Sequence, residues 1–375
     1  MKEHLHIIQR ILPAFEKEQM EIPFKEAGID SLDLVVIRVA LEKYFGFELS
    51  DAKWYECKTL AEAIVFFQKE HNKSDEIICD PKKIECCREL EIRMPQMANS
   101  ALSENWLLKE IGDMHWELLS NGLEQKSSEF KDDSGNRLYA TFVRINYSLS
   151  PLNLFLENEA LCLNMEIKRF GKNTYHSAMK GRCGEKIIVA NLMTNFSRRQ
   201  LDDNSKISKG DPFEMINHIP EVTATPEFLN EYRLLKKGLL SNLNSGDFNF
   251  KVVDDIIGSG QYLINPFYEI NGVGLLYFAS YPIIADKCFN DFLTKTGEIK
   301  NLDYSYNTIY RDIFYFANCN ASDEIIFKIN RIDHLGENRI SVSSSLYRKS
   351  DNTLMARIFT VKEIGRQPCE IFLSQ

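Results

Sequence analysis

Residues 1–72 carry apolar side chains with the period of an α-helix. The apolar positions recur every three or four residues over 4–15 and 31–45, so each segment is expected to form a helix with one buried face. Gly46 follows the second segment and is a suitable C-cap. A last helix is expected after Thr59, which can form a capping box with the glutamate three residues later. The pattern therefore predicts a small four-helix-type bundle.

The spacing of the apolar positions changes after residue 72. Residues 73–89 are largely polar and predict a linker that lets the bundle swing. Beyond it, one helix followed by several alternating strands occurs twice. The first set comprises a helix at 103–119 and strands at 137–145, 161–170, 174–181 and 186–196, and the second comprises a helix at 274–292 and strands at 311–316, 324–332, 339–348 and 353–361. Two antiparallel sheets, each wrapping one helix, predict a double hot-dog domain, and the fold class of the whole chain is α+β.

This repeat sets the expected domain boundaries. The first hot-dog unit is predicted at residues 90–198 and the second at 261–375. Residues 199–260 are expected to connect them, with a helix at 226–240. The repeat is one of pattern, because few residue identities are shared between the two halves.

Ser31 stands at the start of the second predicted helix, within Asp30-Ser31-Leu32 and after the turn residue Gly28. The first N–H groups of a helix lack intrahelical partners, and the helix dipole there favours an anion. A phosphodiester on Ser31 would therefore occupy a favourable position. An ordinary bundle in which the serine caps the helix is the alternative, but the flanking helices and their acidity favour the phosphodiester.

The segment resembles the modification site of acyl carrier proteins. The resemblance covers residues 1–72 and implies that Ser31 holds a covalent 4′-phosphopantetheine, attached by a phosphopantetheinyl transferase. In such carriers an acidic second helix docks basic partners, and Asp30, Asp33 and Glu42 supply that acidity here.

The composition narrows the classes of partner and compartment. The formal net charge of −9 argues against nucleic acid as a partner. No apolar run approaches the ~20 residues that span a bilayer, so no membrane partner is expected. The nine cysteines are scattered and form no Cys-x-x-Cys pair, which predicts neither a metal site nor a disulfide framework. A soluble cytoplasmic protein with reduced thiols is expected.

A second resemblance rests on four segments. They are Arg93-Met94-Pro95-Gln96-Met97, the tryptophan-bracketed run from Leu102 to Trp116, Asn271 to Ala279, and Arg311-Asp312-Ile313-Phe314-Tyr315-Phe316. Together they resemble the bifunctional acyltransferase/decarboxylase family of the leinamycin polyketide pathway, over about residues 90–362. That family has a double hot-dog fold. Its best-known activity decarboxylates methylmalonyl-CoA and delivers propionyl to a carrier thiol, so a coenzyme A thioester is the implied substrate.

Three residues are the candidates for this chemistry. The resemblance implies a tyrosine nucleophile on the strand after the long helix, and Tyr139 occupies the matching region. Decarboxylation leaves an enolate that needs hydrogen-bond donors. Asn105 lies at the start of the helix that Ser103 can cap, and it is a plausible amide donor. His115, further along that helix, is either a proton donor or a core histidine. Arg311 and Asp312 are interpreted as a structural ion pair.

The fusion of the two domains predicts a self-loading enzyme. Methylmalonyl-CoA would acylate Tyr139, lose CO2 and pass as propionyl to the thiol on Ser31, in polyketide-type biosynthesis with assembly-line enzymes as partners. Alternatives are transfer without decarboxylation, and a hot-dog dehydratase or thioesterase that would depend on Glu104 or His115. A non-catalytic module that docks the carrier is the third. No Gly-x-Ser-x-Gly elbow or Gly-x-Gly-x-x-Gly loop supports other enzyme classes.

Overall fold

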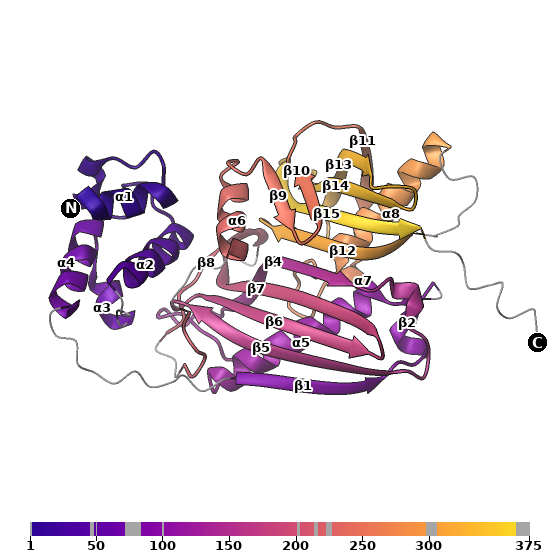
Figure 1. Cartoon of the computed structure of the whole chain (residues 1–375), viewed down its shortest axis with the longest axis horizontal. Coiled ribbons are helices and arrows are strands. Elements are labelled where there is room, and N and C mark those ends of the chain that lie inside the picture. The colour runs from indigo at the N-terminus through magenta and orange to yellow at the C-terminus, as the bar shows by residue number, and fades with distance from the viewer. Residues whose placement is uncertain are drawn as a thin grey trace, which may run out of the picture. The chain divides into compact units, whose positions relative to one another are not determined.

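The chain divides into two compact units, which are described separately. The computed structural model describes residues 2–45, 49, 51–71, 84–99, 101–200, 203–213, 217–222, 227–297 and 306–364. The first unit is formed by residues 1–82, 168–173 and 219–240, and the second by residues 83–167, 174–218 and 241–375. Figure 1 labels the helices and strands of both.

Residues 2–71 of the first unit are helical, as the sequence predicts, and the unit also contains a helix from the expected connector. Its elements are α1 (Lys2–Ile11), the 3-10 helix η1 (Lys17–Glu21), α2 (Ser31–Phe45), α3 (Asp51–Glu56), α4 (Leu60–His71) and α6 (Glu227–Lys236). Ile8, Ile37 and Phe67 lie in its core with no exposed surface. The first helix ends at Ile11 instead of residue 15, because Pro13 has no backbone N–H and restricts the residue before it.

The start of α4 shows the expected capping box. The backbone N–H of Glu62 donates to Thr59 Oγ1 over 3.2 Å, and the N–H of Thr59 donates to Glu62 Oε2 over 3.3 Å. Gly28, in the turn before α2, has a φ of +73°, which a glycine adopts without strain. The C-cap predicted at Gly46 lies outside the described residues.

The second unit is built on one large antiparallel sheet. Its strands are β1 (Ile84–Glu91), β4 (Tyr139–Leu149), β5 (Ala160–Phe170), β6 (Thr174–Cys183), β7 (Lys186–Gln200), β8 (Asp203–Lys209), β11 (Gly258–Leu263), β12 (Tyr306–Tyr315), β13 (Glu324–His334), β14 (Arg339–Arg348) and β15 (Thr353–Ile364). Their spatial order is β1-β5-β6-β7-β4-β12-β15-β14-β13-β11, and β8 pairs with β7. Smaller elements are η2 (Met94–Gln96), β2 (Met97–Ala98), β3 (Ala101–Leu102), η3 (Leu152–Leu154), β9 (Asn242–Ser245), β10 (Phe248–Lys251) and α7 (Pro266–Glu269).

The two halves of this sheet have the same topology. In the first half the chain forms β1, then helix α5 (Glu104–Gly122), then β4 to β7. In the second half it forms β11, then helix α8 (Ser280–Thr296), then β12 to β15. Numbered within each half, the strands lie in the order first, third, fourth, fifth, second. Helix α5 crosses the first half and α8 crosses the second (Figure 1).

The halves meet where β4 pairs with β12, with Ile145 opposite Ile313. The expectation of two separate sheets is therefore corrected to one continuous sheet of 11 strands. The physical reason is that each of these strands would otherwise present a row of unpaired N–H and C=O groups. We call this junction between β4 and β12 the seam.

Two predicted boundaries differ from the structure. Residues 84–89, expected in the linker, form most of β1, in which half-buried side chains alternate with exposed ones. The remainder of the expected linker, residues 73–83, lies outside the described residues. The helix predicted at 274–292 begins only at Ser280, because residues 271–274 form a turn in which the Asn271 carboxamide accepts two backbone N–H groups.

Gly112 in α5 allows the segment that contains Phe278, residues 271–279, to pack against the tryptophan-bracketed helix. A β-carbon on Gly112 would overlap the ring of Phe278, which lies directly against the helix. The same ring lies 4.3 Å from that of Phe142 and 5.9 Å from that of Trp116, measured between centroids. The tryptophan-bracketed helix and the segment before α8 are thus joined by aromatic packing.

Candidate functional site

Ser31 is the first residue of α2, and Asp30 is the residue that caps the helix. The Asp30 carboxylate accepts the backbone N–H groups of Leu32 and Asp33, each over 2.8 Å. The Asp33 carboxylate in turn accepts the backbone N–H of Asp30 over 3.3 Å. The alternative in which the serine caps the helix is therefore wrong, and the half-buried Ser31 hydroxyl is not used by the cap.

This arrangement changes how a phosphodiester on Ser31 would be held. Two of the N–H groups at the start of α2, those of Leu32 and Asp33, already donate to Asp30 and are not available to the phosphate. The helix dipole still favours negative charge at this position. The group would therefore sit in the field of the helix with access to solvent, without direct hydrogen bonds to those two amides.

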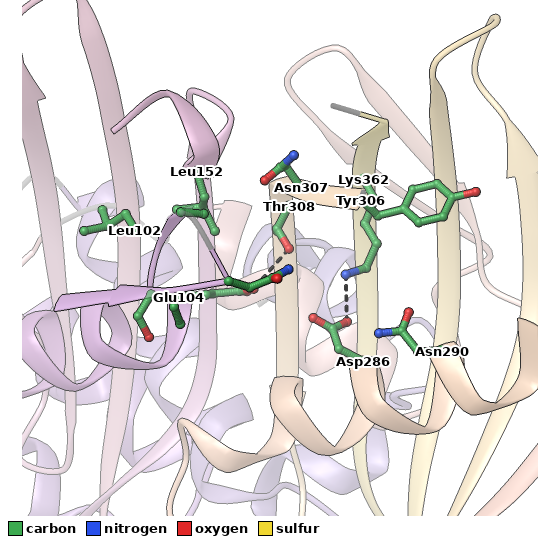
Figure 2. A pocket seen from close by; sticks show the side chains of 13 residues that line it. Leu102, Glu104, Leu152, Asp286, Asn290, Tyr306, Asn307, Thr308 and Lys362 are labelled. Carbon is green, nitrogen blue, oxygen red and sulfur yellow. Dashed lines mark hydrogen bonds and ion pairs between the residues drawn. The ribbon is translucent and has the colours of Figure 1, made fainter. Parts of the chain in front are cut away.

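The second unit contains a pocket at the seam. Its volume is about 200 Å³. The lining comes from β2, β3, η3 and the start of α5 in the first half, and from α8, β12 and β15 in the second. Figure 2 shows Glu104, Asp286, Asn290, Thr308 and Lys362 directed toward a common space, with Leu102 and Leu152 at one side. The pocket thus combines carboxylates, an amine, amides and a hydroxyl with an apolar wall.

Glu104 is placed at the pocket by the first turn of α5. Ser103 caps this helix, because its Oγ accepts the backbone N–H of Trp106 over 3.3 Å. Glu104 accepts hydrogen bonds from the hydroxyl of Thr308, over 3.0 Å, and from the phenol of Tyr147. Its carboxylate also lies 2.7 Å from Nε of Arg311. The position of Glu104 is therefore fixed by groups from both sides of the seam.

Arg311 connects the two acidic residues of the pocket. Its guanidinium is fully buried and pairs with Asp286 over 2.8 Å as well as with Glu104. Lys362 pairs with Asp286 from the other side, over 3.0 Å (Figure 2). Two acids and two bases are held together, so the charges of the network balance.

The network shifts the pKa of several members. Partial burial acts to raise the pKa of Asp286, but the charges of Arg311 and Lys362 outweigh burial and lower it. The pKa of the Tyr147 phenol is well above its ordinary range, first because the side chain is buried and second because Glu104 is negative. Asp286 is consequently ionised and Tyr147 protonated at neutral pH.

The structure does not bring the three predicted catalytic residues together. Asn105 is half-buried at the start of α5, and its side-chain oxygen is buried and accepts no hydrogen bond from any described residue. Tyr139 begins β4, where its ring lies 5.2 Å from the guanidinium of Arg137 and 5.4 Å from that of Arg199. None of the three lines the pocket.

The direction of α5 explains the separation of Asn105 and Tyr139. Glu104 contacts Tyr147, whereas Trp116 donates to the carbonyl of Ala140, so the helix and β4 run in opposite directions. The 11 positions from Asn105 to Trp116 correspond to roughly 16 Å of helix. Tyr139 therefore lies near the other end of α5.

His115 lies inside the first half of the sheet. Its Nδ1 is 2.7 Å from Ser177 Oγ and its Nε2 is 2.8 Å from Thr194 Oγ1, and the side chain has no exposed surface. Burial, with a smaller contribution from His176, lowers its pKa to about 3. Of the two roles considered from the sequence, these contacts favour the core histidine.

Arg311 and Asp312 do not pair with each other, which corrects the sequence interpretation. Adjacent residues of a strand point to opposite faces of the sheet. Asp312 instead forms a fully buried pair with Arg144 of β4, over 2.6 Å. Asp286, Thr308 and Lys362 were not predicted as site residues. The available signal was that each is a polar residue within an otherwise apolar helix or strand pattern.

Two absences apply to the described part of the chain. It contains no group of three or more His, Cys, Asp or Glu side chains arranged to hold a metal ion. Of its helices, none combines the length and apolar character needed to cross a membrane.

Comparison with known proteins identifies the carrier domain and shows a likeness in fold for the rest of the chain. Residues 5–64 match the family described as phosphopantetheine attachment site, so the N-terminal helical region is a carrier domain. No curated protein matches the chain. Among solved structures, the chain resembles the 12:0-ACP thioesterase from Umbellularia californica, with a TM-score of 0.51, 10% identity, and coverage of 75% of this chain and 94% of that one.

A second solved structure gives the same result. The chain resembles a structure described as an oleoyl thioesterase from Lactobacillus plantarum, with a TM-score of 0.52, 10% identity, and coverage of 76% of this chain and 97% of that one. At this identity the likeness concerns the fold. The second unit thus has a large antiparallel sheet of the kind found in hot-dog thioesterases.

Proposed function

We propose that this protein is an enzyme that processes acyl groups carried as thioesters on Ser31 of its own carrier domain. The observation that carries the proposal is the position of Glu104, at the N-terminus of α5 and in the wall of the pocket at the seam. A tethered arm supplies its acyl group at high effective concentration, which favours reaction within one chain. The repeated topology supports reading the second unit as a double hot-dog domain.

The reaction class that the pocket supports best is hydrolysis of the thioester. The N-terminus of α5 would stabilise negative charge developing on the carbonyl oxygen. Glu104, oriented by Tyr147 and Thr308, would remove a proton from a water molecule. The hydroxide oxygen then bonds to the carbonyl carbon, the carbon–sulfur bond breaks, and the departing thiolate takes up a proton. Asp286 would keep Arg311 in position.

Decarboxylative loading is the second candidate, and one observation favours it. The segments that resemble the acyltransferase/decarboxylase family converge, through the packing of Phe278 on Gly112 and the pairing of Arg311 with Glu104. In this route the Tyr139 oxygen takes the methylmalonyl group and coenzyme A leaves. The acyl group then loses CO2, gains a proton at the enolate carbon and moves as propionyl to the thiol on Ser31. Assembly-line enzymes such as polyketide synthases would receive the product.

The experiment follows the acyl group by intact mass spectrometry. The full chain is loaded on Ser31 with acetyl, octanoyl or methylmalonyl pantetheine by a permissive phosphopantetheinyl transferase. Hydrolysis predicts loss of the acyl mass in the parent and retention in Glu104→Gln. Glu110→Gln is the matched control, because Glu110 lies on the same helix but pairs with Arg88 away from the pocket.

The same measurement separates the candidates. For this purpose the chain with a free pantetheine thiol on Ser31 is incubated with methylmalonyl-CoA. A propionyl adduct that is abolished by Tyr139→Phe and retained in Glu104→Gln would favour decarboxylative loading over hydrolysis. Transfer of an unchanged acyl group from coenzyme A would indicate an acyltransferase without decarboxylation. If the acyl groups remain attached and unchanged in the parent and in all variants, the enzymatic proposal is contradicted. The second unit would then be a docking module.

A further inference from the structure

Asp33, two residues after Ser31, is fully buried. Its charge is paired with Arg233 of α6 and with Lys237, which follows that helix. Its carboxylate lies 3.1 Å from Nη1 of Arg233 and 2.7 Å from Nζ of Lys237. The Arg233 side chain is itself only 3% exposed. A buried carboxylate is costly unless charged partners surround it, so this contact organises the first turn of α2.

Tyr232 of α6 and Asp30, the cap of α2, form a second pair of residues where α6 approaches the start of α2. Tyr232 is buried on α6, and both its burial and the nearby charge of Asp30 raise its pKa. Leu229 and Leu235 supply the buried apolar face of α6, while Lys236 is exposed. The helix therefore presents Tyr232 and Arg233 toward the acidic turn that contains Ser31.

Further along α2, another charged cluster belongs to the same unit. Arg38 is 2% exposed, lies 2.8 Å from Glu42, and also lies 3.3 Å from Glu221. Glu221 is held in turn by Arg169 over 2.8 Å. At α3, the Tyr55 hydroxyl accepts the backbone N–H of Lys172 over 3.2 Å. Segments 168–173 and 219–240 thus contact the carrier helices at three points.

We propose that α6 with Lys237 is an intramolecular dock that occupies the recognition face of the carrier domain beside Ser31. An α-helix rises ~1.5 Å per residue, so any protein that reaches Ser31 arrives within one turn of the groups paired with Asp33. A basic partner that needs the Asp33 carboxylate competes with Arg233 and Lys237 for it. The partner class is a protein with its own cationic docking surface, and the first such partner is the phosphopantetheinyl transferase itself.

The dock also sets an order of events. While α6 holds Asp33, the first turn of α2 is protected, and modification of Ser31 requires release of α6. By linkage, a partner that binds the released carrier must supply the free energy needed to separate α6 from α2. A variant in which α6 binds α2 more weakly should therefore bind the partner more tightly by the same factor. The inference rests on the carrier role of Ser31 given above.

The test compares the parent chain with Lys237→Ala and with Lys236→Ala as the matched control. Lys236 is adjacent and exposed, and the change removes the same charge without touching Asp33. The initial rate of phosphopantetheinylation by a transferase with coenzyme A should rise at least about fivefold in Lys237→Ala and remain unchanged in Lys236→Ala. Equal rates in all three chains would overturn the dock.

Hydrogen exchange of the α2 amides gives an independent readout. Exchange in the first turn of α2 should be faster in Lys237→Ala than in the parent or the control, and Arg233→Lys should show a smaller increase. If no chain is modified on Ser31, the carrier proposal fails while the exchange data still decide the dock. Unchanged exchange in Lys237→Ala and Arg233→Lys would overturn the dock even if modification is efficient.

Discussion

The carboxylate of Glu104 lies 2.7 Å from Nε of Arg311 and joins the first residue of α5 to a strand of the other half of the sheet. The two residues are 207 positions apart in the chain. Arg311 also holds Asp286, so one buried cation orders both carboxylates of the pocket. The stability of the seam and the geometry of the candidate site therefore depend on the same side chain.

Arg311→Met should lower the free energy of unfolding of the second unit by about 3–5 kcal/mol, because it leaves two carboxylates without their buried partner. Urea denaturation followed by tryptophan fluorescence measures this loss. Combining Arg311→Met with Asp286→Asn should recover part of it.

Arg331→Met is the control for that change. Arg331 pairs with Asp333, but both side chains are 38% exposed. Exposed pairs contribute at most about 1 kcal/mol, so this variant should be nearly as stable as the parent. Equal losses in the two variants would show that burial of the network does not matter.

Gly112→Ala should destabilise the second unit by about 1–3 kcal/mol, because the new methyl group overlaps the Phe278 ring. An exposed helical glycine would instead gain up to ~1 kcal/mol from the same change. Adding Phe278→Leu should relieve part of the overlap. Gly272→Ala is the control, since a methyl group at that position would meet no atom within 4 Å. A Gly112→Ala protein as stable as the parent would refute the close packing.

The second unit should lose stability on mild acidification through His115. Its pKa is lowered from the usual 6.5 to about 3 in the folded protein, so the unfolded chain binds the proton first. The contribution is fully present above pH 6.5 and is lost as the pH falls toward 3. His115→Gln should show a weaker decrease between pH 7 and 5 than the parent in urea denaturation, whereas His218→Gln, at the surface, should follow the parent.

The first unit should respond in the opposite direction through Glu42. Burial, only partly offset by Arg38, raises its pKa from the usual 4.5 to about 7. The folded form therefore holds a proton that the unfolded chain has lost, and stability falls as the pH rises from 4.5 to 7. The thermal midpoint of the helical signal should drop across this window in the parent and less in Glu42→Gln. The exposed Glu26→Gln serves as control, and parallel curves for all three would rule out this role.

The sequence predicts the elements of the fold well because their signals are local. The capping box of Thr59 and Glu62, the helix after Ser103 and the eight strands of the two sets all depend on periodicity or on residues a few positions apart. The single sheet was not predicted, because the pairing of β4 with β12 joins segments separated by the whole connector.

The candidate site was only partly accessible from sequence for the same reason. Glu104 was noted through the helix terminus, but its partner Arg311 was assigned to the neighbouring Asp312. Arg311 and Asp312 have different partners because adjacent strand residues point to opposite faces of the sheet. Which partners they meet depends on the pairing of distant strands. The contact of Asp33 with Arg233 likewise depends on chain segments some 200 positions apart.

The shared topology of the two halves has a consequence for how such a site can arise. A half-length chain with this strand order would expose its second strand and complete its sheet only by pairing with an identical copy, as in a two-fold homodimer. Joining both copies in one polypeptide removes that symmetry requirement. Each side of the junction is then free to diverge, so one half contributes Glu104 while the other contributes Asp286, Arg311 and Lys362.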